Sequence, residues 1–160
     1  MLEAIVAVYA DWGIGAHGTQ PVVIKADRRR FRELTEGGAV IVGRKTLADF
    51  PGGKPLKNRA NIVLTRQGLS IEGAETASSI ETALKLAAPH SRVFVIGGAS
   101  VYRAMIPHIG CIFVTKIALT PHSDTFFPNL DADPAWRVAE AREEAEENGI
   151  RYRFLTYERV

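Results

Sequence analysis

The hydrophobic positions of this chain fall into short apolar runs, and amphipathic segments separate most of them. Residues 2–10 form a nearly continuous apolar run of strand length, which is typical of a central strand covered on both faces. Shorter runs rich in valine and isoleucine follow at 39–42, 61–64, 93–96 and 111–114. Helical patterns occur at 27–35, from about Arg44, at 79–87 after a capping-type sequence that starts at Ser78, and at 100–105.

This alternation of strand and helix patterns predicts the α/β class. We expect one largely parallel sheet with mostly right-handed crossovers. In such a sheet the ligand binds in a crevice at the carboxyl ends of the strands.

Two local signals conflict in the last segment. Residues 139–147 have strong helix propensity, whereas Trp136 and Val138 alternate with polar residues as in a strand. Asn148-Gly149 is a strong hairpin turn pair, and the alternation continues after it. We therefore predict two antiparallel strands that close an edge of the sheet, with the acidic side chains in water.

Length and composition predict one globular domain that spans residues 1–160. The chain is 46% hydrophobic and 24% charged, a balance that argues against disorder. Its single cysteine, Cys111, excludes an intrachain disulfide, and the first residues lack a basic leader. The longest apolar run falls far short of the ~20 residues that cross a bilayer. We therefore expect a cytoplasmic protein without a membrane segment, and the scattered histidines give no metal site.

One carboxylate is aimed at the core. Asp27 stands four residues before Phe31 and seven before Leu34, so it lies on the apolar stripe of its helix. Burying an unpaired carboxylate is costly. Two interpretations remain open: Asp27 caps its own helix, or it receives a polar partner that arrives from outside.

The glycines after the first strand form a misleading motif. Gly13, Gly15 and Gly18 spell G-x-G-x-x-G, the pattern of a dinucleotide-binding turn from which a helix begins. No apolar periodicity follows them, and Pro21 comes soon after. We therefore predict that residues 11–25 form a long mobile loop of the kind that covers a site.

Basic, hydroxyl and glycine residues follow several of the predicted strands. Residues 43–46 (Gly-Arg-Lys-Thr) do not have the order of a P-loop, and they form either an anion site or a solvated basic helix end. Thr65 and Arg66 end another strand and would suit a phosphate monoester. The paired glycines within residues 96–100 either admit a ligand close to the backbone or form a plain tight turn.

A cluster of arginines on the first predicted helix could suggest nucleic acid. Glu33 and Glu36 interrupt the cluster, and no aromatic stacking platform accompanies it. We therefore interpret it as a solvated helix face and expect no nucleic-acid partner. The cluster consists of Arg28, Arg29, Arg30 and Arg32.

Ordered sequence blocks over nearly the whole chain resemble the dihydrofolate reductase family. The blocks are IVAVYAD, GIGAHGTQP, an aspartate followed four residues later by phenylalanine, VIVGRKT, NIVLTR, VFVIGGASVY, VTKI and SDTFFP. The resemblance implies a dihydrofolate-reductase-like α/β fold, with a central eight-stranded, mostly parallel sheet, a C-terminal antiparallel hairpin and about four flanking helices. It also implies NADPH-dependent reduction of 7,8-dihydrofolate to 5,6,7,8-tetrahydrofolate by a monomer, with hydride transfer from nicotinamide C4 to pterin C6.

The resemblance assigns the substrate side of the site. Asp27 corresponds to the family's ionisable group, which binds the pterin ring nitrogen and 2-amino group and promotes protonation of N5. Burial would raise the pKa of this acid above about 3.9. Thr115 supports the carboxylate, and Arg59 clamps the glutamate carboxylate of the substrate. The remaining residues expected to contact substrate are Ile5, Val6, Ala7, Arg28, Phe31, Leu56, Ile96 and Tyr102.

The resemblance also assigns an NADPH site, in which the basic residues hold phosphates and favour NADP over NAD. The paired glycines would be joined by a cis peptide beside the pyrophosphate. The expected cofactor contacts are Ala7, Ile14, Gly15, Gly18, Gln20, Gly43, Arg44, Lys45, Thr46, Leu64, Thr65, Arg66, Ser78, Gly97, Gly98, Ala99, Ser100, Val101 and Tyr102.

The chain departs from the family pattern after Pro21, where Val22 and Val23 follow in place of the usual tryptophan. Loss of that indole would affect the proton path, loop closure and antifolate affinity. We expect an active enzyme that is weakly inhibited by diaminopyrimidines such as trimethoprim. Two alternatives remain: a non-catalytic pterin or NADPH binder, and a riboflavin-pathway reductase of the same fold, which would leave Asp27 and Arg59 without their partners.

Overall fold

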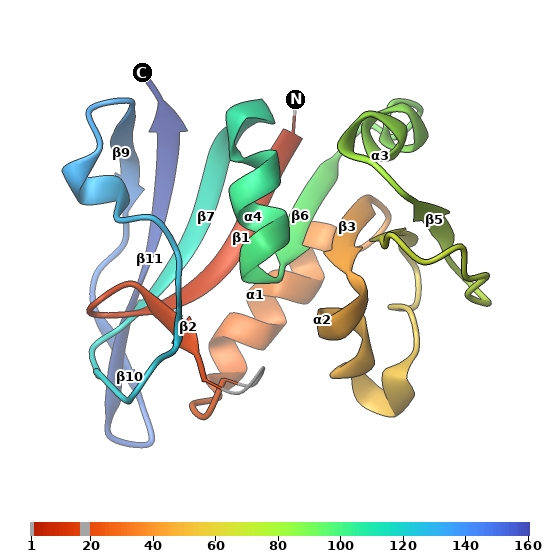
Figure 1. The fold of residues 1–160 in the computed structure, drawn as a ribbon. Coiled ribbons are helices and arrows are strands. Elements are labelled where there is room, and N and C mark those ends of the chain that lie inside the picture. The colour runs from red at the N-terminus through yellow and green to blue at the C-terminus, as the bar shows by residue number, and fades with distance from the viewer. Residues whose placement is uncertain (1, 17–19) are drawn as a thin grey trace.

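The computed structural model, which describes residues 2–16 and 20–160, is built on one mixed sheet (Figure 1). Its order is β10-β11-β7-β1-β6-β3-β4-β5, and β9 also pairs with β11. These strands are β1 Leu2–Tyr9, β3 Ala39–Gly43, β4 Ala60–Leu64, β5 Glu75–Ala77, β6 Val93–Gly97, β7 Ile109–Ile117, β9 Trp136–Ala141, β10 Ala145–Glu147 and β11 Ile150–Arg159.

Nine strands occupy eight positions in this sheet, because β10 and β9 pair with successive parts of β11. Every neighbouring pair from β7 through β1, β6, β3 and β4 to β5 is parallel. β11 runs antiparallel to β7. The predicted α/β fold with a mostly parallel eight-stranded sheet and a C-terminal antiparallel hairpin is therefore confirmed.

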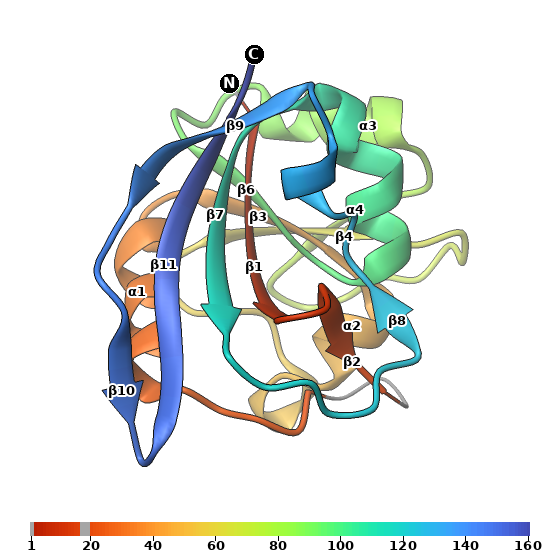
Figure 2. The same cartoon turned by 90° about the vertical axis from the view of Figure 1, so that its left-hand side faces the viewer.

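The helices cover both faces of the sheet, as Figure 2 shows for α1 and α4. They are α1 Lys25–Thr35, α2 Arg44–Ala48, α3 Ile80–Ala87 and α4 Ala99–Met105, with single 3-10 turns at Pro51–Gly53, Ile106–His108 and Leu130–Ala132. Among the described residues, no helix has the length and apolarity needed to span a membrane.

The alternation of side chains along β3 explains why central strands read as unbroken apolar runs. Val40 packs in a cluster with residues of α1, and Val42 packs with Leu47 of α2. Ala39 and Ile41 point the other way, into the cluster that contains buried residues of α3 and α4. Each face of the strand is therefore covered, and polar positions are absent from both.

The C-terminal segment folds as strands, as predicted. Asn148 and Gly149 have φ values of 52° and 79°, the left-handed pair that a two-residue type I′ turn requires. They join β10 to β11, while the acidic side chains of residues 140–146 are exposed. The helix propensity of residues 139–147 is therefore overridden by pairing with β11.

The N-terminus of α1 differs from the prediction. The helix begins at Lys25, so Asp27 is its third residue, and the possibility that Asp27 caps the helix is wrong. The N-cap residue is Ile24, which provides no side-chain cap. Glu147 of β10 replaces it, because its carboxylate accepts hydrogen bonds from the backbone N–H groups of Lys25 at 2.6 Å and Ala26 at 3.1 Å.

The prediction of a long mobile loop over residues 11–25 is wrong for residues 13–15. β2, Gly13–Gly15, pairs there with β8, Thr125–Phe126, in a second, two-stranded sheet. Strands this short carry no readable periodicity. No helix begins at the glycines in the described residues 11–16, and Gly18 lies outside the described residues.

Glu147 is expected to contribute to stability through its cap on α1. We expect Glu147→Ala to lower the free energy of unfolding by about 1 kcal/mol, because two helix N–H groups lose their acceptor. Urea unfolding of both proteins measures the change. Glu146→Ala, which removes an exposed neighbouring carboxylate, is the control. An equal effect of the two substitutions would contradict the capping role.

Candidate active site

A deep cavity of about 1840 Å³ opens at the carboxyl ends of the parallel strands. β1, β3, β4 and β6 all contribute residues to its wall. Single small-molecule sites usually measure about 300–1,000 Å³, so this cavity has room for two ligands side by side. Its lining divides into a mostly apolar half beside α1 and a basic half beside α2.

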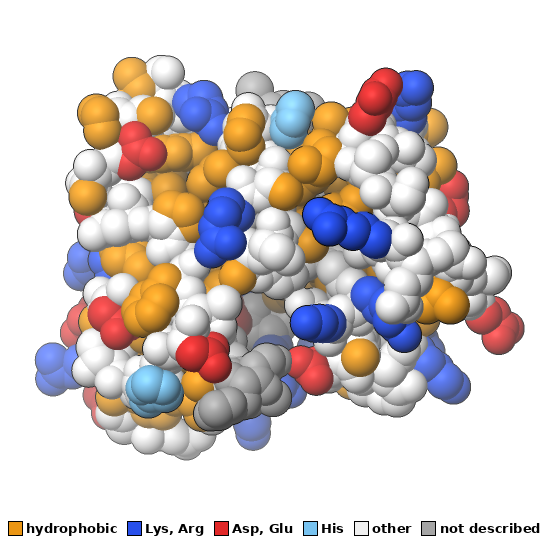
Figure 3. Space-filling model, in the orientation of Figure 1, with side chains coloured by type: hydrophobic (Ala, Val, Ile, Leu, Met, Phe, Trp, Pro, Cys, Tyr) orange, Lys and Arg blue, Asp and Glu red, His pale blue; other side chains and the backbone are white. Residues whose placement is uncertain are grey.

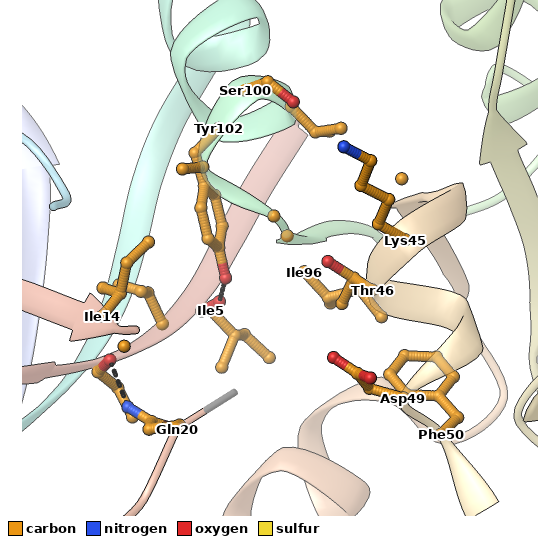
Figure 4. Close-up of a pocket in the computed structure, with 18 of the residues that line it drawn as sticks. Ile5, Ile14, Gln20, Lys45, Thr46, Asp49, Phe50, Ile96, Ser100 and Tyr102 are labelled. Atoms are coloured by element: carbon orange, nitrogen blue, oxygen red, sulfur yellow. Dashed lines mark hydrogen bonds between the residues drawn. The ribbon is translucent and has the colours of Figure 1, made fainter. Parts of the chain in front are cut away.

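A bulge in β6 brings one side chain into the cavity wall. The pairing of β3 with β6 passes from Ile41–Val95 to Val42–Gly97 and so skips Ile96. Such a bulge re-aims the extra residue. Ile96 is half-buried and lines the cavity between the two halves, as the close-up in Figure 4 shows.

Asp27 lies in the apolar half, on the first turn of α1. Its Oδ1 accepts a 2.5 Å hydrogen bond from the Thr115 hydroxyl on β7. Burial raises the pKa of the Asp27 carboxyl, while the Thr115 hydrogen bond and the charges of Arg30 and Arg28 act in the opposite direction. The acid is thus held on the cavity side of the sheet with one fixed donor, and its other oxygen has no hydrogen-bond partner among the described residues.

Apolar walls and one tyrosine surround this carboxylate. Ile5 comes from β1, Phe31 from α1 and Leu56 from the segment that precedes β4, and all three line the cavity. The Tyr102 hydroxyl donates a 2.5 Å hydrogen bond to the Ile5 carbonyl (Figure 4). Burial, and next the Asp27 charge, raise the pKa of the Tyr102 hydroxyl, so this group stays protonated and acts as a donor.

A fixed arginine stands at the outer end of the apolar half. Arg59 Nε donates to the Thr35 hydroxyl at 2.8 Å, and its Nη1 donates to the Lys57 carbonyl at 2.7 Å. The guanidinium carbon lies 5.9 Å from the centre of the Phe31 ring. Three contacts therefore hold the planar group in one orientation. Its remaining N–H groups have no hydrogen-bond partner in the described part of the chain, so they can bind a carboxylate.

The basic half of the cavity lies where α2 and β4 meet. The Arg44 guanidinium donates a hydrogen bond to the side-chain carbonyl of Gln67, and the backbone N–H of Gln67 donates to the Thr65 hydroxyl at 3.2 Å. Hydrogen bonds therefore connect the residues of this rim. Figure 3 shows lysine and arginine side chains on this face of the molecule. Arg44, Lys45 and Arg66 all line the cavity, and their charges suit a phosphorylated nucleotide.

Paired glycines lie between the two halves. The peptide bond between Gly97 and Gly98 is cis, and a Cβ atom on Gly98 would meet the Thr46 hydroxyl at 2.9 Å. The backbone here is therefore packed against α2 with no room for a side chain. α4 begins at Ala99, directly after the glycines, and its first residues also line the cavity.

Gln20 lies at the mouth of the cavity, opposite α2. Its side-chain amide donates a 3.0 Å hydrogen bond to the Ala7 carbonyl of β1 (Figure 4). Ile14 and Gly15 of β2 line the cavity next to it. The segment before α1 is thus connected to the central strand through a polar side chain.

The structure brings most of the sequence-derived site residues to this one cavity. With two exceptions, every residue assigned from the sequence to substrate or cofactor lines it. Thr115 lies behind Asp27 and is not part of the wall, and Gly18 lies outside the described residues.

Several lining residues were missed by the sequence reasoning. Asp49 and Phe50 follow α2 and face the cavity (Figure 4), and Arg32 lies one turn after Arg28 on α1. The spacing of Arg32 on the helix could have identified it. Asp49 and Phe50 follow a helix of only five residues, which is too short to show an apolar face.

The wall at the position of the absent indole is formed by Val22, which lines the cavity and packs against the cluster of Tyr9 and Ile24. The Tyr9 hydroxyl accepts a 3.2 Å hydrogen bond from the backbone N–H of Val22. Neither tryptophan of the chain replaces the indole. Trp12 stacks on Phe127 away from the cavity lining.

The arginine cluster on α1 is only partly solvated. Arg28, Arg29 and Arg32 are exposed, as predicted for a solvated helix face. The prediction is wrong for Arg30, which is half-buried with its guanidinium against two phenylalanine rings. A stacked arginine of this kind depends on strands distant in the sequence, so the helix pattern alone does not reveal it.

A protein-family model described as dihydrofolate reductase matches residues 1–159. The dihydrofolate reductase of Neisseria meningitidis serogroup B is 39% identical over 146 residues, which cover 90% of this chain and 89% of that protein. The dihydrofolate reductase of Staphylococcus haemolyticus is 35% identical, and that match covers 99% of this chain and 96% of that protein.

The chain is also 36% identical to a bifunctional dihydrofolate reductase-thymidylate synthase of Glycine max, of whose length it spans 33%. Among solved structures, dihydrofolate reductase from Enterococcus faecalis complexed with NADP(H) superposes with a TM-score of 0.89 at 32% identity. That match covers 99% of this chain and 96% of the other.

Asp27 is expected to lower the stability of the folded protein at neutral pH. Because burial raises its pKa above the unfolded value of 3.8, the folded state binds the proton more tightly than the unfolded chain. Stability is therefore lost as the pH rises from about 3.8 through the folded pKa. Asp27→Asn, which cannot ionise, should be more stable than wild type at pH 7.

Urea unfolding of both proteins at two pH values measures this effect. The advantage of Asp27→Asn should disappear near pH 3, where both side chains are neutral. A difference that does not change with pH would contradict the assignment.

Proposed function

The chain belongs to the dihydrofolate reductase family, and we propose how its own residues carry out the reaction. The enzyme reduces 7,8-dihydrofolate to 5,6,7,8-tetrahydrofolate with NADPH as reductant. In this reaction the N5=C6 double bond of the pterin receives a hydride at C6 and a proton at N5. The protein must therefore orient the pterin, favour the proton on N5 and keep bulk water away from the reacting atoms.

The position of Asp27 in the cavity supports this function most directly. It is a carboxylate at the base of an apolar half-cavity, with Thr115 as a fixed donor on one oxygen. A pterin presents adjacent N–H donors on its ring nitrogen and 2-amino group, which match a carboxylate. We assign Asp27 to these two groups. Its charge then fixes the orientation of the ring and favours the protonated form of N5.

The apolar walls act through exclusion of water. Ile5 and Ile96 line the cavity and pack in one cluster with Phe31 and Leu56, and we assign this cluster to the pterin and benzoyl rings. Removing water strengthens the interaction of Asp27 with the pterin, because the local dielectric constant falls. Tyr102, held by the Ile5 carbonyl, closes the cofactor side.

Arg59 is assigned to the glutamate end of the substrate. Its guanidinium is already fixed by Thr35 and Lys57, so little conformational entropy is lost when a carboxylate binds. The fork of N–H donors matches a carboxylate in a bidentate manner. The substrate would thus be held at both ends, by Asp27 at the pterin and by Arg59 at the glutamate.

NADPH supplies the hydride when it is bound. We assign its phosphates to the basic half of the cavity, where Arg44, Lys45 and Arg66 stand beside the Thr65 hydroxyl. These groups suit the extra 2′-phosphate that distinguishes NADP from NAD. Because Gly97 and Gly98 carry no side chains, the pyrophosphate would be able to approach the backbone closely here.

The residues that line one cavity of this chain provide for both ligands. We propose that the enzyme acts on small molecules as a monomer, with a mass in solution near 17.5 kDa. We also propose that it works in the cytoplasm.

The role of Asp27 predicts a large loss of turnover on neutralisation. With 7,8-dihydrofolate and NADPH at pH 7, we expect kcat of Asp27→Asn to fall by roughly 10²-fold or more, a size typical of lost acid–base assistance. The absorbance of NADPH follows the reaction. Asp133→Asn, which changes an exposed aspartate, should retain the activity of the wild type. Undiminished turnover of Asp27→Asn would remove Asp27 from the mechanism.

Val22 predicts weak inhibition by trimethoprim, because the cavity wall lacks the indole at this position. We expect Val22→Trp to tighten inhibition by roughly tenfold, about 1.4 kcal/mol. Inhibition titrations of the two proteins measure the difference. Val138→Trp, at an exposed position of β9 that does not line this cavity, controls for the added ring. Tight inhibition of the wild type would refute the expectation.

A further inference from the structure

Arg30 lies on α1 three residues after Asp27. Residues three apart are neighbours on a helix surface, so the two side chains leave the helix on adjacent parts of one face. Arg30 does not line the cavity, and it is half-buried between the helix and the sheet. The resemblance and the proposed mechanism give it no role.

The sheet beneath α1 explains where the two side chains lie. Asp27 contacts Thr115 of β7. Phe113 is two residues before Thr115, so it lies on the same face of β7. Phe154 of β11 is the direct cross-strand partner of Thr115. The two rings therefore adjoin Thr115 on one surface, where Arg30 rests on the rings and Asp27 contacts Thr115.

The rings hold the guanidinium in place. Its central carbon lies 4.5 Å from the centre of the Phe154 ring and 5.4 Å from that of Phe113. Arg30 has no hydrogen bond or ion pair with any other described residue. Its charge is thus fixed in position but is not neutralised by a direct carboxylate contact.

Other charged and titratable groups also face Arg30. Arg142 and Glu140 approach it from the C-terminal end of β9, and they pair with each other at 2.9 Å. Cys111 approaches from β7, where burial raises the pKa of its thiol to about 11 and keeps it neutral near pH 7. Arg142 and Glu140 largely offset each other, so among the described residues Asp27 is the remaining anion that faces Arg30.

We propose that Arg30 is a positioning residue, whose clamped charge favours the ionised form of Asp27 that receives the pterin. Burial of Asp27 opposes its ionisation, and the Arg30 charge limits this effect. Arg28 also faces Asp27, but its side chain is exposed, so water and salt screen its charge. Arg30 is less exposed than Arg28 and more strongly fixed. The consequence for catalysis rests on the proposed role of Asp27.

The test removes the charge of Arg30 but keeps much of the apolar part of its side chain. Arg30→Met should raise the pH at which Asp27 titrates by roughly 0.5–1 unit, because a nearby cation is lost. The ¹³C carboxyl resonance of Asp27 in the ligand-free protein, assigned by its loss in Asp27→Asn, measures the midpoint directly. The pH midpoint of kcat should shift in the same direction. Arg29→Met, which removes an exposed arginine from the same helix, should move neither midpoint.

A second variant separates charge from packing. Arg30→Lys retains the cation but loses the planar stacking, so its Asp27 midpoint should stay within about 0.3 unit of the wild type even if the protein unfolds more easily. If Arg30→Met does not fold, Arg30→Gln replaces it with the same expectation.

An unchanged resonance midpoint in the neutral variant would overturn the proposal, and so would an equal shift in Arg29→Met. A shifted resonance with an unchanged kcat profile would preserve the interaction between Arg30 and Asp27. That outcome would instead contradict the proposed catalytic role of Asp27.

Discussion

A carboxylate held inside an apolar half-cavity is the constraint on which the rest of the site depends. Asp27 is costly to bury, and three features of the fold reduce that cost. The hydroxyl of Thr115 donates to it, the N-terminal end of α1 provides a favourable field, and Arg30 lies beside it against two rings. α1 in turn depends on Glu147, which caps it from the C-terminal hairpin. The position of the acid is thus set by residues from both ends of the chain.

The same sheet edge places two kinds of chemistry next to each other. One half of the cavity is apolar and ends at Arg59, which is fixed by Thr35. The other half is basic and lies between α2 and the paired glycines. Ile96, turned inward by a bulge in β6, stands where they join. This division matches a reaction between a flat, largely apolar ring with an acidic tail and a phosphorylated nucleotide, which must meet face to face with little water between them.

The sequence carried the features that depend on local pattern. The apolar run of β1 and the Asn148-Gly149 turn were predictable, because periodicity and turn chemistry act over a few residues. The cap of α1 was not, since Glu147 lies more than a hundred residues from Lys25. The location of Arg30 against Phe113 and Phe154 was also not predictable, because the register of strands distant in the sequence decides which side chains lie under a helix. The apolar stripe of the helix also predicted that the Asp27 carboxylate points to the core. Its contact with Thr115 was predicted only from the family resemblance.

In the proposed mechanism, Asp27 serves the substrate half of the cavity and not the cofactor half. The most direct test is to measure the dissociation constants of dihydrofolate and NADPH separately, by quenching of protein fluorescence, for the wild type and Asp27→Asn. We expect dihydrofolate to bind more weakly to the variant at neutral pH, while the affinity for NADPH stays the same. Equal weakening of both ligands, or of NADPH alone, would contradict it.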